Sequence, residues 1–212
     1  MLNARHPDNA KRLKGVVIMF LTRMALDVNR PETRTLIATP ELLRLTVRLM
    51  FAGGNLQPLY RLDEIGSRTW LVLLSHLRPE MLAAYARFGY AGVFPSWETF
   101  DFEDSLQTVT GGSVLNFELS ACPFELADVD QPVPEKEAAL DWLKTQGQQN
   151  GFAVLRSDLA DYGLLHTEYG LFVSGRWNGK LRVTDEDRFL NALHAGFGQH
   201  RDDYGAGLMT VS

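Results

Sequence analysis

The sequence predicts an α+β protein made of two tandem ferredoxin-like (RRM-like) βαββαβ domains. Three observations support this class: each half holds about 100 residues, the apolar pattern of each half runs strand, helix, strand, strand, helix, and prolines and glycines mark the helix ends. We expect an N-terminal extension over residues 1–18, a first domain over 19–111 and a second domain over 112–212. The boundary is expected near Thr110-Gly111-Gly112.

The first half opens with a β-branched, apolar stretch that favours a strand. Thr39 is expected to cap a helix that begins with Pro40, because threonine is a common N-cap and proline is favoured at the first helical position. The closing strand of this half is only weakly marked. The marked elements are a strand at 16–26, a helix from Pro40 to Gly53-Gly54, strands at 58–62 and 69–75, and a helix from Pro79 to Gly89.

The second half repeats this order of elements. Asn178-Gly179 between two extended stretches predicts a hairpin turn, since Asn-Gly is a strong hairpin signal. Thr184 with Asp187 three residues later resembles a capping box for the last helix. The elements are a strand at 114–121, a helix from Glu135 to about Gln146, an extended piece from Gly151, strands at 169–173 and 180–183, and a glycine-terminated helix that ends at Ala195.

The composition, with 45% hydrophobic and 22% charged residues, is that of a globular protein. The longest apolar run, residues 15–21, is far shorter than the roughly 20 residues of a membrane span. Thr22 and Arg23 follow that run in place of a small-residue cleavage site, so we expect neither a transmembrane segment nor a signal peptide. The single cysteine, Cys122, excludes an internal disulfide and a multi-cysteine metal site and fits a cytoplasmic protein.

Charge is distributed unevenly along the chain. Residues 1–60 hold nine Lys and Arg against four acidic residues, whereas residues 61–212 hold 12 against 22. The segment 88–135 has nine carboxylates and no basic residue. This polarity suits a protein that offers one face to a polyanion and another to a protein partner, although a solvated surface with scattered charge would give the same counts.

Five stretches together resemble the CasE-type CRISPR endoribonucleases of the RAMP superfamily. Residues 19–49, which begin MFLTRMALDV, are similar to the family's opening strand and capped helix. Residues 117–123 (FELSACP) stand where the family has an arginine-rich strand, and residues 139–152 resemble its WL-containing helix. The stretch 180–185 and the pattern GFG…GAGLMTV over 196–211 resemble its last strand, helix and glycine-rich loop. The resemblance covers about residues 19–212.

The resemblance implies a nuclease that needs no metal and no cofactor. Such proteins bind the stem-loop of a CRISPR repeat RNA and cleave at its 3′ base, where the 2′-hydroxyl attacks the adjacent phosphodiester. The expected partners are the repeat hairpin or mature crRNA and the other subunits of a type I-E or type IV effector complex. That chemistry requires a base to take the hydroxyl proton, an acid to protonate the leaving oxygen and fixed positive charge to stabilise the phosphorane. In agreement, the sequence holds no metal-ligand spacing such as H-E-x-x-H.

The chain departs from the family at the helical position that usually carries the catalytic histidine. Counted from Met19 as the family's first residue, this position falls on Arg44. An arginine with a pKa above about 12 cannot act as a general base, but its donors suit a phosphorane, so Arg44 is the predicted electrostatic catalyst. The alternative is an exposed ion pair with Glu41, which lies one turn earlier.

Other departures lie in the second half. Glu118 and Ser120 stand where the family often has arginines, and His200-Arg201 lie near its usual lysine. An imidazole can donate or accept a proton near neutral pH, so His200 is the second predicted catalytic residue. An ordinary exposed loop histidine is the alternative.

The loop GFGQHRDDYGAG, residues 196–207, can present backbone N–H groups to phosphate oxygens because glycine permits close approach and positive φ. A connection packed tightly on a neighbouring helix is the alternative. The predicted RNA-binding residues are Arg23, Arg34, Arg48, Gly196, Gly198, Arg201, Gly205 and Gly207.

Three functions remain open from the sequence. The first is an active repeat-processing endoribonuclease, and the second is a catalytically inactive RNA-binding subunit of the same fold. The third is a ferredoxin-like small-molecule enzyme or regulatory domain, which would have a polar pocket and no affinity for RNA. The missing histidine favours the second function without excluding the first.

Overall fold

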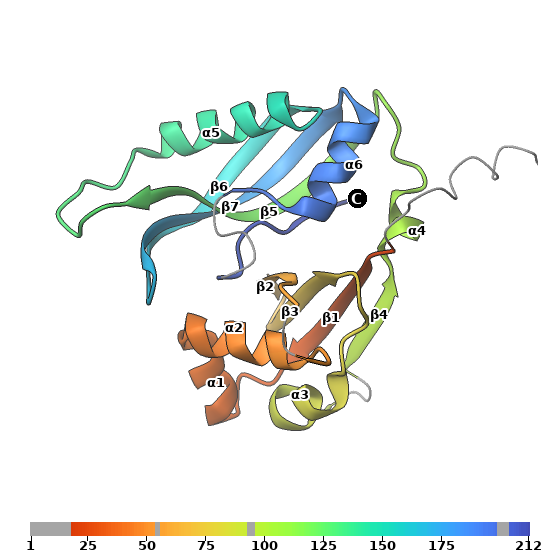
Figure 1. The fold of residues 1–212 in the computed structure, drawn as a ribbon, viewed down its shortest axis with the longest axis vertical. Helices are drawn as coiled ribbons and strands as arrows, with labels where there is room; N and C mark the ends of the chain where they lie inside the picture. Colours follow the sequence, from red (N-terminus) through yellow and green to blue (C-terminus); the bar gives the residue numbers. More distant parts are fainter. Residues whose placement is uncertain (1–17, 54–55, 93–95, 199–203) are drawn as a thin grey trace, which may run out of the picture.

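The computed structural model describes residues 18–53, 56–92, 96–198 and 204–212. It contains two four-stranded antiparallel sheets, each with helices packed on one face (Figure 1). Helices α1, α2 and α3 cover one sheet and helices α5 and α6 cover the other, so the two uncovered faces are directed toward each other. Within the described residues, the helices are all too short or too polar to cross a membrane.

The first sheet has the strand order β2-β3-β1-β4. The predicted order of strand, helix, strand, strand, helix is confirmed, and β4 is the closing strand that the sequence marked weakly. The sequence did not predict two short helices, α1 and α4. The elements are β1 (Phe20–Leu26), α1 (Pro31–Ala38), α2 (Pro40–Leu49), β2 (Leu59–Ile65), β3 (Arg68–Ser75), α3 (Met81–Phe88), β4 (Trp97–Asp101) and α4 (Phe102–Leu106).

The second sheet has the equivalent order β6-β7-β5-β8. Both halves therefore show the βαββαβ order and the same antiparallel strand arrangement, which confirms the predicted tandem ferredoxin-like fold. The elements are β5 (Val114–Leu126), α5 (Lys136–Gln149), β6 (Phe152–Thr167), β7 (Gly170–Val183), α6 (Glu186–Ala195) and β8 (Met209–Val211).

The predicted turn at Asn178-Gly179 is wrong, because both residues lie inside the continuous strand β7. A Cβ atom on Gly179 would lie 2.0 Å from the carbonyl oxygen of Arg156, so this glycine allows the backbones of β6 and β7 to approach closely. The hairpin instead turns at Glu168 and Tyr169. This correction moves the turn ten residues toward the N-terminus and makes the hairpin much longer.

Two helix caps also differ from expectation. Thr39 precedes α2 as predicted, but its side chain makes no capping hydrogen bond. The N-cap of α6 is Asp185 and not Thr184, and its carboxylate accepts the N–H of Arg188 at 3.1 Å. The predicted end of α6 is confirmed by Gly196, which follows the helix with φ 80°.

The hydrophobic core joins the two halves. One buried cluster lies between the first sheet and helices α1 to α3. The larger cluster combines Leu21 and Val72 of the first sheet with Leu119 and Leu181 of the second. The halves therefore share apolar packing, and the domain boundary near Thr110, in the connection between α4 and β5, stays a prediction.

Candidate functional site

Arg44 of α2 lies where the first half meets the β6–β7 hairpin of the second. Its side chain is 7% exposed, and Nη2 donates to Glu168 Oε1 at 2.5 Å and to the Tyr169 hydroxyl at 3.4 Å. The guanidinium also lies 5.3 Å from the ring centre of Tyr169 and 5.9 Å from that of Tyr204. A cation at these distances from aromatic rings is stabilised by the ring quadrupoles.

A second contact ties the hairpin turn to α2. The carboxylate of Glu41 accepts the backbone N–H of Glu168 at 3.2 Å. Arg44 and Glu41, one helical turn apart, therefore contact the same residue of the turn. The interpretation of Arg44 as an exposed ion-pair partner of Glu41 is wrong, because Arg44 is buried and its carboxylate partner is Glu168.

The other predicted RNA-binding arginines lie on different parts of the molecule. Arg23 on β1 pairs with Glu98 of β4 and lies 5.7 Å from the ring centre of Trp70. Arg34 on α1 donates to two backbone carbonyls of the preceding loop. Arg48 lies one turn after Arg44 on α2 and is partly exposed. Only Arg48 thus shares an element with the predicted catalytic Arg44.

The four glycines of the C-terminal loop all have positive φ, from 70° to 94°. A Cβ atom on Gly196 would lie 2.8 Å from the side chain of Leu59, and the N–H of Gly207 donates to the Ser120 carbonyl at 2.6 Å. Packing against β2 and β5 therefore explains the need for glycine at some positions of this loop. That the four glycines Gly196, Gly198, Gly205 and Gly207 contact phosphate stays a prediction.

His200 and Arg201 lie outside the described residues. The described residue nearest to them on the C-terminal side is Tyr204, whose ring approaches Arg44. Within the described part of the chain, no three His, Cys, Asp or Glu side chains are grouped so that they could hold a metal ion.

Sequence reasoning did not identify Glu168 and Tyr169 as site residues. The signal that could have found them is the turn itself, since a glutamate and a tyrosine precede a glycine between two long extended stretches. The misplaced turn at Asn178-Gly179 put both residues at a strand start, far from any expected contact with α2.

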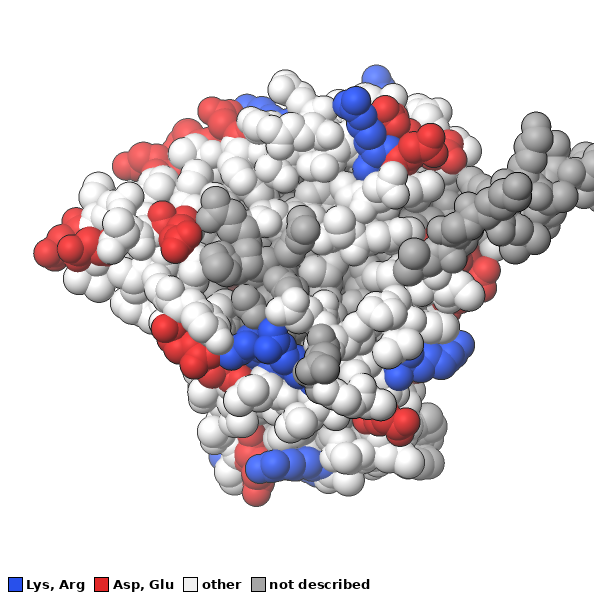
Figure 2. All heavy atoms as spheres, in the orientation of Figure 1, with Lys and Arg blue, Asp and Glu red and all other residues white. Residues whose placement is uncertain are grey.

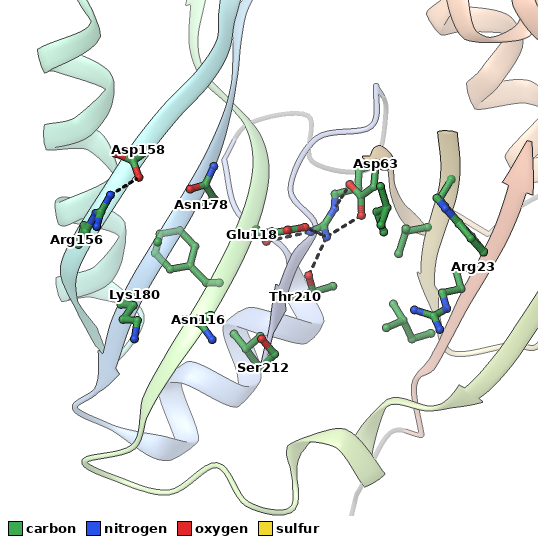
Figure 3. A pocket seen from close by; sticks show the side chains of 18 of the residues that line it. Arg23, Asp63, Asn116, Glu118, Arg156, Asp158, Asn178, Lys180, Thr210 and Ser212 are labelled. Carbon is green, nitrogen blue, oxygen red and sulfur yellow. Dashed lines mark hydrogen bonds and ion pairs between the residues drawn. The ribbon is translucent and has the colours of Figure 1, made fainter. Parts of the chain in front are cut away.

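A cleft of about 660 Å³ separates the two uncovered sheet faces (Figure 3). Trp70 and Phe100 line it from the first sheet, and Asn116, Asn178 and Lys180 line it from the second. Most of its charged side chains are paired, and Figure 3 shows one such pair, Arg156 with Asp158, on β6. Because the charges nearly balance, the cleft offers a polyanion little net attraction.

A buried arginine bridges the sheets within this cleft. The Arg61 side chain, 4% exposed, donates Nε and Nη2 to the Asp63 carboxylate at 2.7 and 2.9 Å. It also donates to Glu118 Oε2 at 3.0 Å and to Thr210 Oγ1 at 2.8 Å, both in the second sheet. Figure 3 shows Asp63, Glu118 and Thr210 converging on this guanidinium. Arg61 therefore connects the two halves.

Charged side chains on the face drawn in Figure 2 form small mixed groups. Acidic side chains gather at the end of the molecule over the connection from β5 to α5, which carries the exposed Asp128, Asp130 and Glu135. Elsewhere on this face, Lys and Arg side chains occur in separate small groups, most of them beside acidic ones. Among the described residues of this face, a phosphate backbone would meet small groups of cations and no continuous basic surface.

Comparisons with known proteins agree on one family and one fold. The family model described as CRISPR associated protein matches residues 19–212. A structure of the CRISPR endoribonuclease Cse3 bound to 19-nucleotide RNA is 21% identical, with TM-score 0.73 over 92% of this chain and 99% of that chain. No match was found among curated proteins.

Two further structures share the fold. Cas6e from Escherichia coli K-12 is 15% identical, with TM-score 0.63 over 91% of this chain and 98% of that chain. A chain of a CRISPR RNA-guided surveillance complex in its pre-nicking state is 20% identical, with TM-score 0.60 over 91% of this chain and 99% of that chain. These similarities span both halves of the molecule.

Proposed function

This chain belongs to the CRISPR-associated protein family, and we propose on that premise that it matures CRISPR RNA. It binds the stem-loop of the precursor repeat and cleaves at the 3′ base of the stem by metal-independent attack of the 2′-hydroxyl. It then stays bound to the product as a subunit of an effector complex. The RNA-bound endoribonuclease and the surveillance-complex chain that share its fold support these two partners.

The position of Arg44 is the observation that carries this proposal. Counted from Met19, it falls on the helical position where the family resemblance implies a histidine. It lies buried at the contact of α2 with the β6–β7 turn. A guanidinium in such a site presents oriented donors at low cost of reorganisation, which is what a phosphorane with developing negative charge requires. Arg44 therefore acts through charge, and the proton transfer belongs to another group.

His200 is proposed for a proton-transfer step, as base or acid. His200→Ala should then lower the single-turnover cleavage rate by about a hundredfold or more and leave hairpin affinity nearly unchanged, because one neutral imidazole adds little to an interface of many phosphates. Arg201→Ala should do the reverse, with weaker binding and a nearly normal rate at saturation. An unchanged rate in His200→Ala would remove the histidine from the site.

RNA binding is proposed to involve Arg23, Arg34 and Arg48 together with the C-terminal loop. Each phosphate contact releases counterions, so affinity should fall as salt rises. A titration with a repeat hairpin and with a scrambled RNA of equal length tests the binding step. Equal affinity for both RNAs would contradict recognition of the hairpin.

The cleavage step is tested with enzyme in excess over a labelled hairpin, with and without EDTA. A hairpin with 2′-deoxyribose at the cleaved nucleotide is the matched control, since it should bind equally and stay intact. The expected product ends in a 2′,3′-cyclic phosphate. Cleavage that EDTA abolishes, or that survives the 2′-deoxy substitution, would contradict the mechanism.

The second candidate is an RNA-binding subunit without catalysis. The replacement of the histidine by Arg44 favours it, because arginine cannot accept the hydroxyl proton. Tight, hairpin-specific binding without cleavage by the wild-type chain would establish this alternative.

A further inference from the structure

Glu168 places a carboxylate directly beside the guanidinium of Arg44, the predicted electrostatic catalyst. Its Oε1 is 2.5 Å from Arg44 Nη2, and its side chain is 47% exposed, so RNA can reach it from solvent. The residue is held at two points, because Glu41 also accepts its backbone N–H at 3.2 Å. A carboxylate held from α2 in this way keeps a defined position relative to Arg44.

We propose that Glu168 is the general base that takes the proton from the attacking 2′-hydroxyl, an assignment that rests on the proposed function. The hydroxyl and the phosphate it attacks belong to the same nucleotide, so their catalytic partners must also be neighbours. Arg44 Nη2 and Glu168 Oε1 are in direct contact at 2.5 Å, so a nucleotide whose phosphate is bound by Arg44 has its 2′-hydroxyl beside the Glu168 carboxylate.

The step balances with these groups and water. Glu168 accepts the hydroxyl proton while the 2′-oxygen forms its bond to phosphorus, and Arg44 donates to a non-bridging oxygen as negative charge grows. The bond from phosphorus to the 5′-oxygen breaks, and that oxygen takes its proton from the general acid, which is the role that remains for His200 in the proposed function when Glu168 is the base. Proton exchange with water then restores the Glu168 carboxylate and the acid.

Among the described neighbours of Arg44, Glu168 is best suited to this role. A carboxylate is a proton acceptor that can serve as a general base, whereas each tyrosine hydroxyl already carries its own proton. This separates Glu168 from Tyr169 and Tyr204. Glu41 is also a carboxylate, but its contact is with the backbone N–H of Glu168, whereas the Glu168 carboxylate contacts the Arg44 guanidinium directly.

The test compares Glu168→Gln with wild type in single-turnover cleavage of the repeat hairpin. Glutamine keeps the size of the side chain and an oxygen that can accept from Arg44, but it cannot act as a base at neutral pH. General-base catalysis contributes about 10²–10⁴-fold, so the rate should fall by that factor at unchanged hairpin affinity. Asp141→Asn is the matched control, because Asp141 is also exposed and paired with a cation, Lys144, at 2.8 Å.

The pH dependence separates a base from a structural residue. Within the described part of the chain, the groups that face Glu168 are Glu41 and Arg44 from α2 and the two tyrosines, Tyr169 and Tyr204, that contact the Arg44 guanidinium. In Glu168→Gln, hydroxide must replace the missing base, so the deficit relative to wild type should shrink by about tenfold per pH unit above neutrality. Glu168→Asp, which keeps a carboxylate, should retain an intermediate rate and serves as the test if the glutamine variant does not fold.

Each outcome decides between the two proposals. Cleavage by Glu168→Gln at the wild-type rate would overturn the base assignment and leave the endoribonuclease intact. A deficit that is independent of pH, or that comes with an equal loss of affinity, would make Glu168 a structural residue. Hairpin binding without cleavage by wild type would overturn the proposed endoribonuclease and the base together.

Discussion

Replacing Arg61 should destabilise the protein strongly, because this arginine is buried and bridges the two sheets. In Arg61→Met the aliphatic stem is kept and the guanidinium is lost. The Asp63 carboxylate, 8% exposed, then loses both of its charge-assisted hydrogen bonds from Arg61. Glu118 is 59% exposed and can turn toward solvent, so the cost arises mainly at Asp63.

The size of the effect follows from burial. Removing one partner of a buried ion pair costs about 3–5 kcal/mol, because the other charge stays buried without compensation. Arg176 Nη1 lies 3.8 Å from Asp63 Oδ1 and offsets part of this, so we expect the lower end, about 3 kcal/mol. For a chain of this length, about 2–4 °C per kcal/mol gives a fall in Tm of about 6–12 °C.

The second sheet provides a matched control. Arg156 and Asp158 on β6 form the same Arg-x-Asp pair as Arg61 and Asp63 on β2, but their side chains are 77% and 61% exposed. An exposed pair contributes about 0–1 kcal/mol, so Arg156→Met should leave Tm within a few degrees of wild type. Scanning calorimetry on both variants measures the difference.

One further variant checks the cause. If an uncompensated carboxylate causes the loss, then Arg61→Met combined with Asp63→Leu should be more stable than Arg61→Met alone, since no buried charge remains. Equal Tm shifts in Arg61→Met and Arg156→Met, or a double variant less stable than the single one, would refute this account.

Three further predictions concern other residues. Arg44→Ala should slow single-turnover cleavage by about a hundredfold or more, and Arg44→Lys should recover only part of it, since lysine lacks the guanidinium fork; wild-type rates in both would exclude Arg44. Gly179→Ala should lower the free energy of unfolding, measured by urea titration, by about 1–3 kcal/mol, because the new Cβ atom would clash with the backbone of Arg156. Gly163→Ala should leave it nearly unchanged, because a Cβ atom there meets no atom within 4 Å. Burial raises the pKa of the Cys122 thiol from 9.0 to about 12, so iodoacetamide should react slowly at pH 8 until urea unfolds the chain, and stability should fall as pH rises from 9 toward 12.

The fold could be predicted from the sequence because its signals are local. The proline at the start of α2 and the glycine after α6 act on their own backbone, and the strands carry apolar side chains that periodicity can detect. Helix α1 was not predicted because only Thr33 and Leu36 of its eight residues are buried, and two buried positions are too few to reveal the helical periodicity of apolar residues. The wrong turn at Asn178-Gly179 has a non-local cause, since Gly179 is needed because the backbone of β6 lies close to it and not because the chain turns there.

The site could be predicted only in part, for a similar reason. Family resemblance pointed to Arg44, but the identity of its partner depends on a contact between residues 124 positions apart. No local pattern specifies such a contact. Charge counts also overstate the positive charge that is free to meet RNA, because basic residues of the first half already make contacts within the protein: Arg34 donates to backbone carbonyls and Arg23 pairs with Glu98.

The arginine at position 44 and the carboxylate at position 168 are best understood as one feature. A histidine at that helical position could be buried neutral and could exchange a proton itself, whereas an arginine is charged at every accessible pH and is costly to bury without a counter-charge. Glu168 supplies that counter-charge, and its carboxylate can exchange the proton that arginine cannot. On the proposed mechanism, the two functions that one imidazole would combine are thus divided between the two ends of an ion pair that joins α2 to the β6–β7 turn. It follows that Arg44→His combined with Glu168→Gln should cleave the hairpin faster in single turnover than Glu168→Gln alone, because an imidazole can take the proton that neither arginine nor glutamine accepts. Equal rates in the two variants would contradict this division of roles.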